Sequence, residues 1–269
     1  MKKVLYFLTG CAMFLAACDV DKETVENTEY EKLTYGDPKY SYIKILNLSP
    51  GSPVVNFYMD GKKFSSRQST NGVEGGYTYN QLFPDIGYAV TSPGNHVLTG
   101  KVIPSAAADP TLEVFSANIS PAAGKYYTII PNGLYDPVTK KIPLFITLED
   151  VRPALDTTKI FVRLVNILSG GSNTSLIRGT TNADPKIINN IPVNGASDWA
   201  EISLPGGGPT PTLSFLFVDA NTNAPIGSVV TFTGTTALIK GRAYTMYIRG
   251  ITGTTGTNGP ALSAYTTFY

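Results

Sequence analysis

The chain contains two copies of one pattern, and this internal repeat constrains its fold more than any other feature. Four pairs of similar segments recur at a nearly constant separation of about 118 residues, which is the signature of tandem structural units. The pairs are 43–49 with 162–168, Asp60-Gly61 with Arg178-Gly179, 124–129 with 241–246, and 144–147 with 262–265. We therefore predict two homologous domains, at residues 39–152 and 157–269, joined near 153–156.

Each copy has the pattern of short β-strands separated by turns. Apolar and polar residues alternate over 42–48, and Asp60-Gly61 favours a hairpin because glycine tolerates the positive φ of a type I′ turn. The predicted strands are 42–48, 54–59, 88–91, 96–103, 112–119, 126–130 and 144–148, then 160–167, 175–178, 199–204, 213–219, 226–232, 244–248 and 262–268. Strands of this number and spacing, without helical periodicity, indicate an all-β chain with two tandem immunoglobulin-like antiparallel β-sandwich domains.

The charge balance excludes one class of partner. The chain has 21 Lys and Arg against 20 Asp and Glu, and charged residues make up only 15% of it. A protein that binds nucleic acid needs a basic face to meet the phosphates, so we predict no nucleic-acid partner.

The amino terminus, residues 1–17, has the pattern of a lipoprotein signal peptide. Lys2 and Lys3 precede an apolar run over 4–15, and Leu15-Ala16-Ala17-Cys18 places small residues before a cysteine. Because a spanning helix takes about 20 apolar residues, the run is too short to cross a membrane and is typical of a removable signal. We predict cleavage before Cys18 and lipidation of Cys18, so that the protein's membrane partner is reached through this lipid.

Residues 18–38 form a separate segment, which we predict to be an acidic flexible tether. Acidic residues from Asp19 to Glu31 lie among polar neighbours, and such a composition buries too little apolar surface to fold. A second lipidation candidate, Cys11, would leave an apolar run of only 4–8 before the cut. Because cleavage before Cys18 removes Cys11, the mature chain is expected to have no internal disulfide.

Five segments of the first copy carry a family resemblance. They are Lys-Ile-Leu-Asn-Leu-Ser-Pro at 44–50, Asp60-Gly61-Lys62, Gly87-Tyr88, Pro93-Gly94 and Gly-Lys-Tyr-Tyr-Thr at 124–128. The repeat resembles a β-sandwich domain of unknown function that many lipid-anchored proteins of diderm bacteria contain, often in tandem. The second copy departs from the pattern, since Gly170 replaces the proline and Arg178 the aspartate. The resemblance implies architecture and location, and it brings no catalytic residue.

The acidic residues after Cys18 also bear on location. In some diderm bacteria, such residues resemble an export signal to the outer face of the outer membrane. We therefore predict a lipid-anchored protein of the outer membrane displayed at the cell surface, with a periplasm-facing protein as the alternative.

The chain offers few groups for catalysis. His96 is the one histidine, and no Gly-x-Ser-x-Gly motif accompanies it, so a surface strand or turn is favoured over a catalytic triad. Ordinary zinc and copper sites need more His or Cys, so neither metal nor cofactor is expected. Spacing alone leaves open a carboxylate pair for glycoside hydrolysis, but most acidic residues lie beside Pro, Gly or Asn, as turn residues do. We predict that the protein is not an enzyme.

Two further patterns have a structural and a functional interpretation. The segment 219–223 begins like a calcium loop, but Ala224 and Val230 stand where such a loop has Gly and Glu, so a hairpin turn is favoured. Tyr77, Tyr79 and Tyr88 are candidate ligand contacts, because aromatic faces give large contact areas at low entropic cost. The single tryptophan, Trp199, is expected in the core.

Together these patterns favour a non-enzymatic cell-envelope lipoprotein whose tandem domains act as a binding or adhesion module for a glycan or a protein. The alternative is a structural or assembly subunit of an envelope or pilus-type complex, in which the final strand, 262–268, pairs with another protomer by strand addition. The sequence determines neither the ligand nor the oligomeric state.

Overall fold

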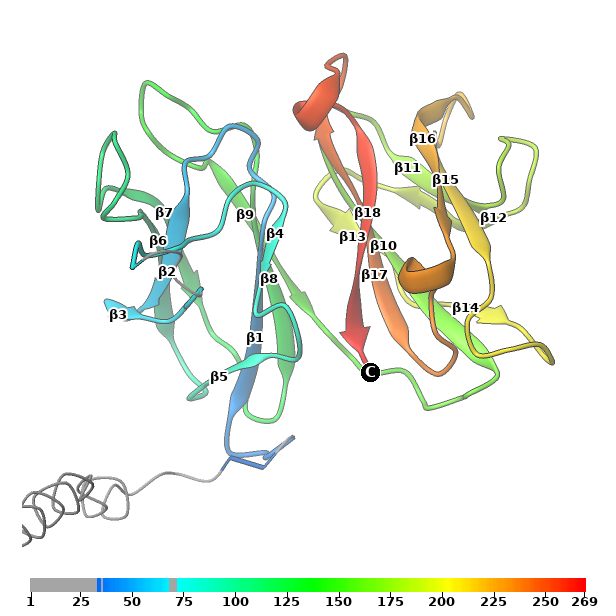
Figure 1. Cartoon of the computed structure of the whole chain (residues 1–269), viewed down its shortest axis with the longest axis horizontal. Helices are drawn as coiled ribbons and strands as arrows, with labels where there is room; N and C mark the ends of the chain where they lie inside the picture. Colours follow the sequence, from blue (N-terminus) through cyan, green and yellow to red (C-terminus); the bar gives the residue numbers. More distant parts are fainter. Residues whose placement is uncertain (1–32, 35, 68–71) are drawn as a thin grey trace, which may run out of the picture. The chain divides into compact units, whose positions relative to one another are not determined.

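The structure is a computed structural model that describes residues 33, 34, 36–67 and 72–269. The chain divides into two compact units, residues 1–37 and 38–269. The signal peptide, Cys18 and most of the tether lie outside the described residues, so the expectations for them stay predictions. The regular structure in the described part of 38–269 consists of strands joined by turns and loops, together with two short 3-10 helices, η2 (Gly234–Thr236) and η3 (Gly256–Asn258) (Figure 1). Within the described residues, no helix has the length and hydropathy needed to cross a membrane.

The first half of the 38–269 unit is a sandwich of two sheets. One sheet has the order β4 (Gln81–Phe83), β1 (Ser41–Asn47), β8 (Tyr126–Asn132) and β9 (Leu144–Glu149), with β5 (Ala89–Thr91) also paired to β1. The facing sheet has the order β3 (Lys62–Lys63), β2 (Val55–Met59), β6 (His96–Val102) and β7 (Glu113–Ile119). The predicted hairpin joins β2 to β3, and Asp60 and Gly61 have φ values of 50° and 79°, as a type I′ turn requires.

The second half repeats this arrangement. One sheet has the order β13 (Gly195–Ala196), β10 (Lys159–Ser169), β17 (Ala243–Ile251) and β18 (Ala261–Phe268), with β14 (Ala200–Ser203) also paired to β10. The other has the order β12 (Lys186–Ile191), β11 (Thr174–Arg178), β15 (Leu213–Asp219) and β16 (Pro225–Phe232). The predicted all-β sandwich fold is therefore confirmed.

One strand pair in each half differs from the predicted antiparallel arrangement. β1 runs parallel to β8, with Ile43 opposite Tyr127, and β10 runs parallel to β17, with Val162 opposite Tyr244. Parallel neighbours need a long crossover connection, and here the chain passes through the facing sheet between the two strands. Alternation along a single strand does not specify the direction of its neighbour.

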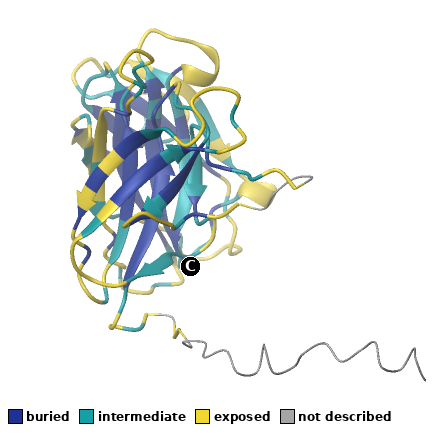
Figure 2. Ribbon diagram, turned by 90° about the vertical axis from the view of Figure 1, so that its left-hand side faces the viewer, coloured by how far each residue is buried: buried dark blue, intermediate teal, exposed yellow. Residues whose placement is uncertain are grey.

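Each sandwich encloses its own apolar core. Figure 2 shows that buried residues follow the strands and that exposed residues gather in the loops. Phe57, Leu98 and Phe115 are central to the first core, and Leu164, Phe215 and Phe217 to the second. Strand β12 is absent from the predicted strands. Its sequence contains two consecutive asparagines, and Asn190 has a φ of 56°, so the strand is irregular in its register with β11.

Candidate functional site

The central strands β1 and β10 are buried on both faces, which places polar side chains between the two sandwiches. Ile43 and Ile45 of β1 point into the first core, so Lys44 and Leu46 point to the opposite face of the sheet. In β10, Arg163 is the repeat equivalent of Lys44 and also lies on the face away from its core. The two faces meet in one apolar cluster, whose buried members are Leu46, Leu48, Ile130, Val165, Ile167 and Tyr247.

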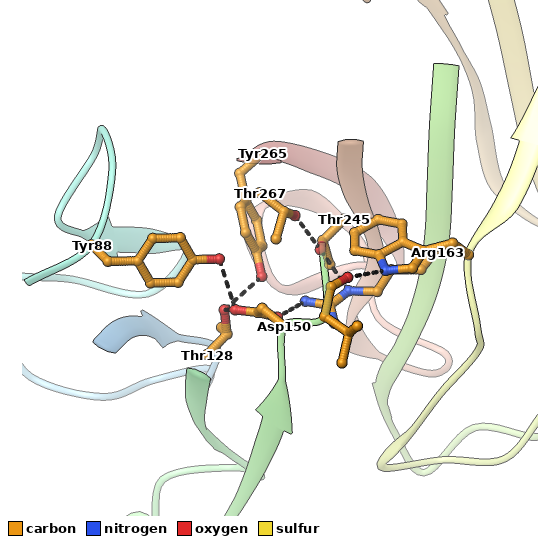
Figure 3. Close-up of polar contacts among 9 residues, drawn as sticks. Tyr88, Thr128, Asp150, Arg163, Thr245, Tyr265 and Thr267 are labelled. Carbon is orange, nitrogen blue, oxygen red and sulfur yellow. Dashed lines mark hydrogen bonds and ion pairs between the residues drawn. The ribbon is translucent and has the colours of Figure 1, made fainter. Parts of the chain in front are cut away.

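A buried ion pair joins the halves beside this cluster (Figure 3). The Arg163 guanidinium contacts the Asp150 carboxylate, and their side chains are 5% and 0% exposed. Asp150 also accepts hydrogen bonds from Thr128 Oγ1 at 2.6 Å and Tyr88 Oη at 2.9 Å, while Arg163 Nε donates to Thr245 Oγ1 at 2.8 Å. Both carboxylate oxygens of Asp150 thus have partners, and no atom of the pair is among the described buried polar atoms without one, as burial of opposite charges requires.

Trp199 completes this junction instead of filling a core, which corrects the prediction for it. The Arg163 guanidinium lies 4.9 Å from the Trp199 ring centroid, and Trp199 Nε1 donates to the Val151 carbonyl at 2.8 Å. The half-buried ring packs in a cluster with Phe161 and Phe268. A tryptophan with a polar contact at one edge suits such a junction between two apolar faces.

Lys44, the equivalent cation of the first half, is fully buried, and no carboxylate of the described residues forms an ion pair with it. Its Nζ donates to the Pro84 carbonyl at 3.4 Å and lies 4.8 Å from the Tyr88 ring centroid. Burial lowers the pKa of Lys44 to about 8, although the charges of Asp150 and Asp85 oppose this shift. The junction therefore holds two cations and one fully buried carboxylate.

A cleft of about 1210 Å³ opens beside the junction, with walls from both sandwiches. The first sandwich contributes Leu46, Ser66, Arg67, Tyr77, Asn80, Gln81, Leu82 and Asp85, and the second contributes Val230, Phe232, Tyr247, Leu262, Ser263, Ala264 and Tyr265. Hydrogen bonds link the walls, since Tyr247 Oη donates to Asn80 Oδ1 at 2.8 Å. Among the described lining residues Arg67 and Asp85 alone carry a full charge, so the walls are close to neutral.

The three tyrosines predicted as ligand contacts lie at or beside this junction, and they do not form one exposed patch. Tyr77 lines the cleft but is only 6% exposed, and its hydroxyl donates to the Ser66 carbonyl. Tyr79 lies under Arg249, whose guanidinium carbon is 5.2 Å from the ring centroid. Tyr88 is bound to Asp150 and stacks near Phe268. Their contacts are with the protein itself, and their role toward a ligand stays a prediction.

His96 lies at the start of β6, as predicted for a surface strand or turn, with Ser92 and Asp60 on either side. Nδ1 is 2.6 Å from Asp60 Oδ2, and Nε2 is 2.9 Å from the Ser92 carbonyl and 3.3 Å from Ser92 Oγ. Both nitrogens face acceptors, so both are placed to donate, and the hydrogen bond with Asp60 raises the pKa of His96. A ring whose Nε2 donates to a carbonyl is not placed to take the proton of Ser92.

The segment resembling a calcium loop is the β15–β16 hairpin turn, as favoured from the sequence. Asp219 Oδ1 accepts from the Asn221 and Thr222 amides at 2.8 Å each, and Oδ2 accepts from Ser172 Oγ. The Ser172 hydrogen bond and the two amides lower the pKa of Asp219 to about 2. Among the described residues, no group of three or more His, Cys, Asp or Glu is placed to hold a metal ion.

The place of Lys44, Asp150 and Arg163 at a buried junction was not predicted from the sequence. A basic residue at the same repeat position in both copies, inside otherwise apolar strands, was the available signal. This signal is weak, because polar residues also alternate with apolar ones in strands that have one face exposed to solvent.

Comparison with known proteins adds little to this geometry. No protein-family model matches the chain, and no curated protein matches it. One similar solved structure is a presumed cell adhesion protein from Bacteroides uniformis, with 10% identity, a TM-score of 0.22, and coverage of 87% of this chain and 98% of that one. Another, from Bacteroides eggerthii, is a presumed cell adhesion protein with 13% identity, a TM-score of 0.21, and coverage of 86% and 96%. At such TM-scores the likeness supports no argument about what this chain binds.

Proposed function

We propose that the protein is a non-enzymatic binding module of the cell envelope, attached by lipid on Cys18, whose glycan or protein ligand occupies the inter-sandwich cleft. The observation that supports this most is a large cleft whose two walls are joined by a buried ion pair and an apolar cluster. Ligand sites are usually concave and formed before the ligand arrives, and they favour the junctions between domains.

The size and charge of the cleft restrict the ligand. Small-molecule pockets commonly measure about 300–1,000 Å³, so a cleft of about 1210 Å³ suits an extended ligand better than a small one. One cation, Arg67, and one carboxylate, Asp85, suit a ligand with little net charge. A single carboxylate among the described lining residues does not supply the pair that glycoside hydrolysis uses.

The test is a ligand screen with a variant that fills the cleft. The Cys18→Ala chain is screened on glycan and protein arrays, and each ligand found is measured against Ser66→Trp and Val138→Trp. Ser66 is an exposed residue of the cleft wall, whereas Val138 is 87% exposed and lies outside the lining. We expect Ser66→Trp to weaken binding at least tenfold and Val138→Trp to leave it unchanged.

Two results would contradict the proposal. Equal binding by both tryptophan variants would place the ligand elsewhere on the protein. The absence of any ligand on the arrays, together with no partner in crosslinked envelopes, would remove the binding function itself.

A further inference from the structure

The strand β18 forms an unpaired edge of its sheet along the cleft. It is the last strand in the order β13, β10, β17, β18, and among the described residues its ladder is with β17 alone. Four consecutive residues, Leu262, Ser263, Ala264 and Tyr265, line the cleft. Since successive side chains of a strand point to opposite faces, a run of four lining residues indicates that the backbone edge itself faces the cleft.

The pairing of β17 shows which backbone groups of β18 are free. The Phe161 amide donates to the Arg242 carbonyl at 3.1 Å, and the Thr252 amide donates to the Ser169 carbonyl at 3.0 Å. Even-numbered residues of β17 therefore bond to β10, and odd-numbered residues such as Thr245 bond to β18.

The partners of these odd-numbered residues follow from the β17–β18 register. Tyr247 lies opposite Ser263, and Thr245 lies opposite Tyr265. Ser263 and Tyr265 thus use their amides and carbonyls on β17. The amides and carbonyls of Leu262 and Ala264, which alternate with them, point away from β17 toward the free edge.

The edge of β18 lacks the features that normally prevent pairing with another strand. Its eight residues, Ala261–Phe268, include no charged residue and no proline. The one register shift in its ladder with β17 lies at its carboxyl end, between Thr266 and Phe268, beyond the four residues that line the cleft. Other edge strands of the molecule have such features: β7 begins with Glu113, β9 ends with Glu149, and β16 begins with Pro225 and has a register shift. Charges, prolines and bulges are the usual means by which proteins protect sheet edges.

We propose that the cleft binds an extended, uncharged peptide segment of a partner protein, which adds to the sheet as a strand beside β18. This inference rests on the proposed function and specifies its ligand class. Main-chain hydrogen bonds to Leu262 and Ala264 provide the affinity, and alternate peptide side chains contact the two walls of the cleft. The four lining residues of β18 span about 10 Å, at roughly 3.3 Å per residue.

Two other possible occupants of the cleft, the acidic segment of this chain and a glycan, fit the cleft less well than an uncharged peptide. The acidic segment 19–31 of this chain does not match walls with one cation and one carboxylate. A glycan lacks the regularly spaced amides and carbonyls that complement a strand edge, so it would leave the free groups of β18 without regular partners.

The test uses proline as a probe of the free edge. Octapeptides displayed as a library rich in Thr, Val and Ser are selected on the Cys18→Ala chain, and their affinities are measured by fluorescence anisotropy. Ala264→Pro removes one outward amide without removing a bond to β17, which an edge strand tolerates. Ser116→Pro is the matched control, because Ser116 is exposed on the edge of β7 and lies outside the cleft.

We expect Ala264→Pro to weaken peptide binding at least tenfold and Ser116→Pro to leave it unchanged. N-methylation of alternate peptide amides should have the same effect as Ala264→Pro. In the unsubstituted strand, bound peptide should slow hydrogen exchange at the amides of Leu262 and Ala264, which keeps the test valid if the proline variant does not fold.

The remaining outcomes separate this inference from the proposed function. If selected peptides bind but neither Ala264→Pro nor N-methylation weakens them, strand pairing is wrong. If no peptide binds while a glycan binds and Ser66→Trp abolishes it, strand pairing is wrong and the binding function stands. If Ser66→Trp affects no ligand of any class, both are wrong.

Discussion

At the scale of single residues, the contact between Arg163 and Asp150 has the largest expected effect on stability. Asp150→Ala leaves the buried guanidinium without a counter-charge, and removal of one partner of a buried pair costs about 3–5 kcal/mol. We therefore predict a decrease of this size in the free energy of unfolding, measured by urea denaturation. The double variant Asp150→Leu/Arg163→Met should lose less free energy of unfolding than Asp150→Ala does, because it leaves neither charge of the pair buried alone. Equal losses in both would show that the charge is not the cause.

His96 makes stability depend on pH. The pKa of His96 is raised in the folded protein, so His96 stabilises the fold fully at a pH below its pKa in the unfolded state, near 6.5. This stabilisation is lost as the pH rises through the pKa of His96 in the folded state. The hydrogen bond with His96 lowers the pKa of Asp60 in the folded protein. The stabilisation from Asp60 is therefore present above its pKa in the unfolded state, about 4, and is lost as the pH falls through its pKa in the folded state.

The prediction is that the thermal midpoint of the wild type, relative to that of His96→Gln, falls between pH 6 and pH 9; the difference between the two proteins cancels the opposite trend expected from buried Lys44. The groups facing His96 are the Asp60 carboxylate and the Ser92 carbonyl, and Lys62 lies near Asp60. Unfolding is followed by circular dichroism in wild type and variant over this range. An identical pH dependence in the two proteins would contradict the assignment of the proton to His96.

At the scale of elements, β18 contributes to more than one part of the fold. Leu262 belongs to the second core, and Phe268 packs beside Tyr88 and Tyr126 of the first sandwich. We predict that deletion of 262–269 unfolds the second sandwich and destabilises the first, as measured by circular dichroism and hydrogen exchange. A folded first sandwich together with the loss of an oligomer would instead support the assembly subunit, in which this strand is donated to a neighbour.

The sequence predicts the elements well and their packing poorly. Strands such as β15 match their predicted bounds because alternation and turn residues are local signals. The junction depends on which strands of different domains come together, and no local pattern encodes that. Lys44 and Arg163 therefore look like solvent-facing residues in the sequence and are buried in the structure. The free edge of β18 likewise follows only from sheet order, which the sequence does not specify.

At the scale of the whole molecule, the predicted lipid on Cys18 bears on where the proposed binding function is exercised. We predict that Cys18→Ala leaves the protein without lipid, either released or retained unlipidated in the periplasm, because the proposed lipid on Cys18 is its membrane anchor. Protease added to intact cells should digest the wild-type protein if it is displayed at the surface. Protection until the outer membrane is broken would place it facing the periplasm and exclude adhesion. The control is digestion of both forms after lysis.

The single carboxylate at the junction makes the two halves complementary rather than interchangeable. Asp150, next to the end of β9, has Phe268 as its counterpart in the repeat, while Lys44 and Arg163 are both cationic. A second half facing another second half would bring two arginines together with no acid between them. The second half thus depends on the first for the counter-charge of its buried arginine, because its own face supplies no acid at that position.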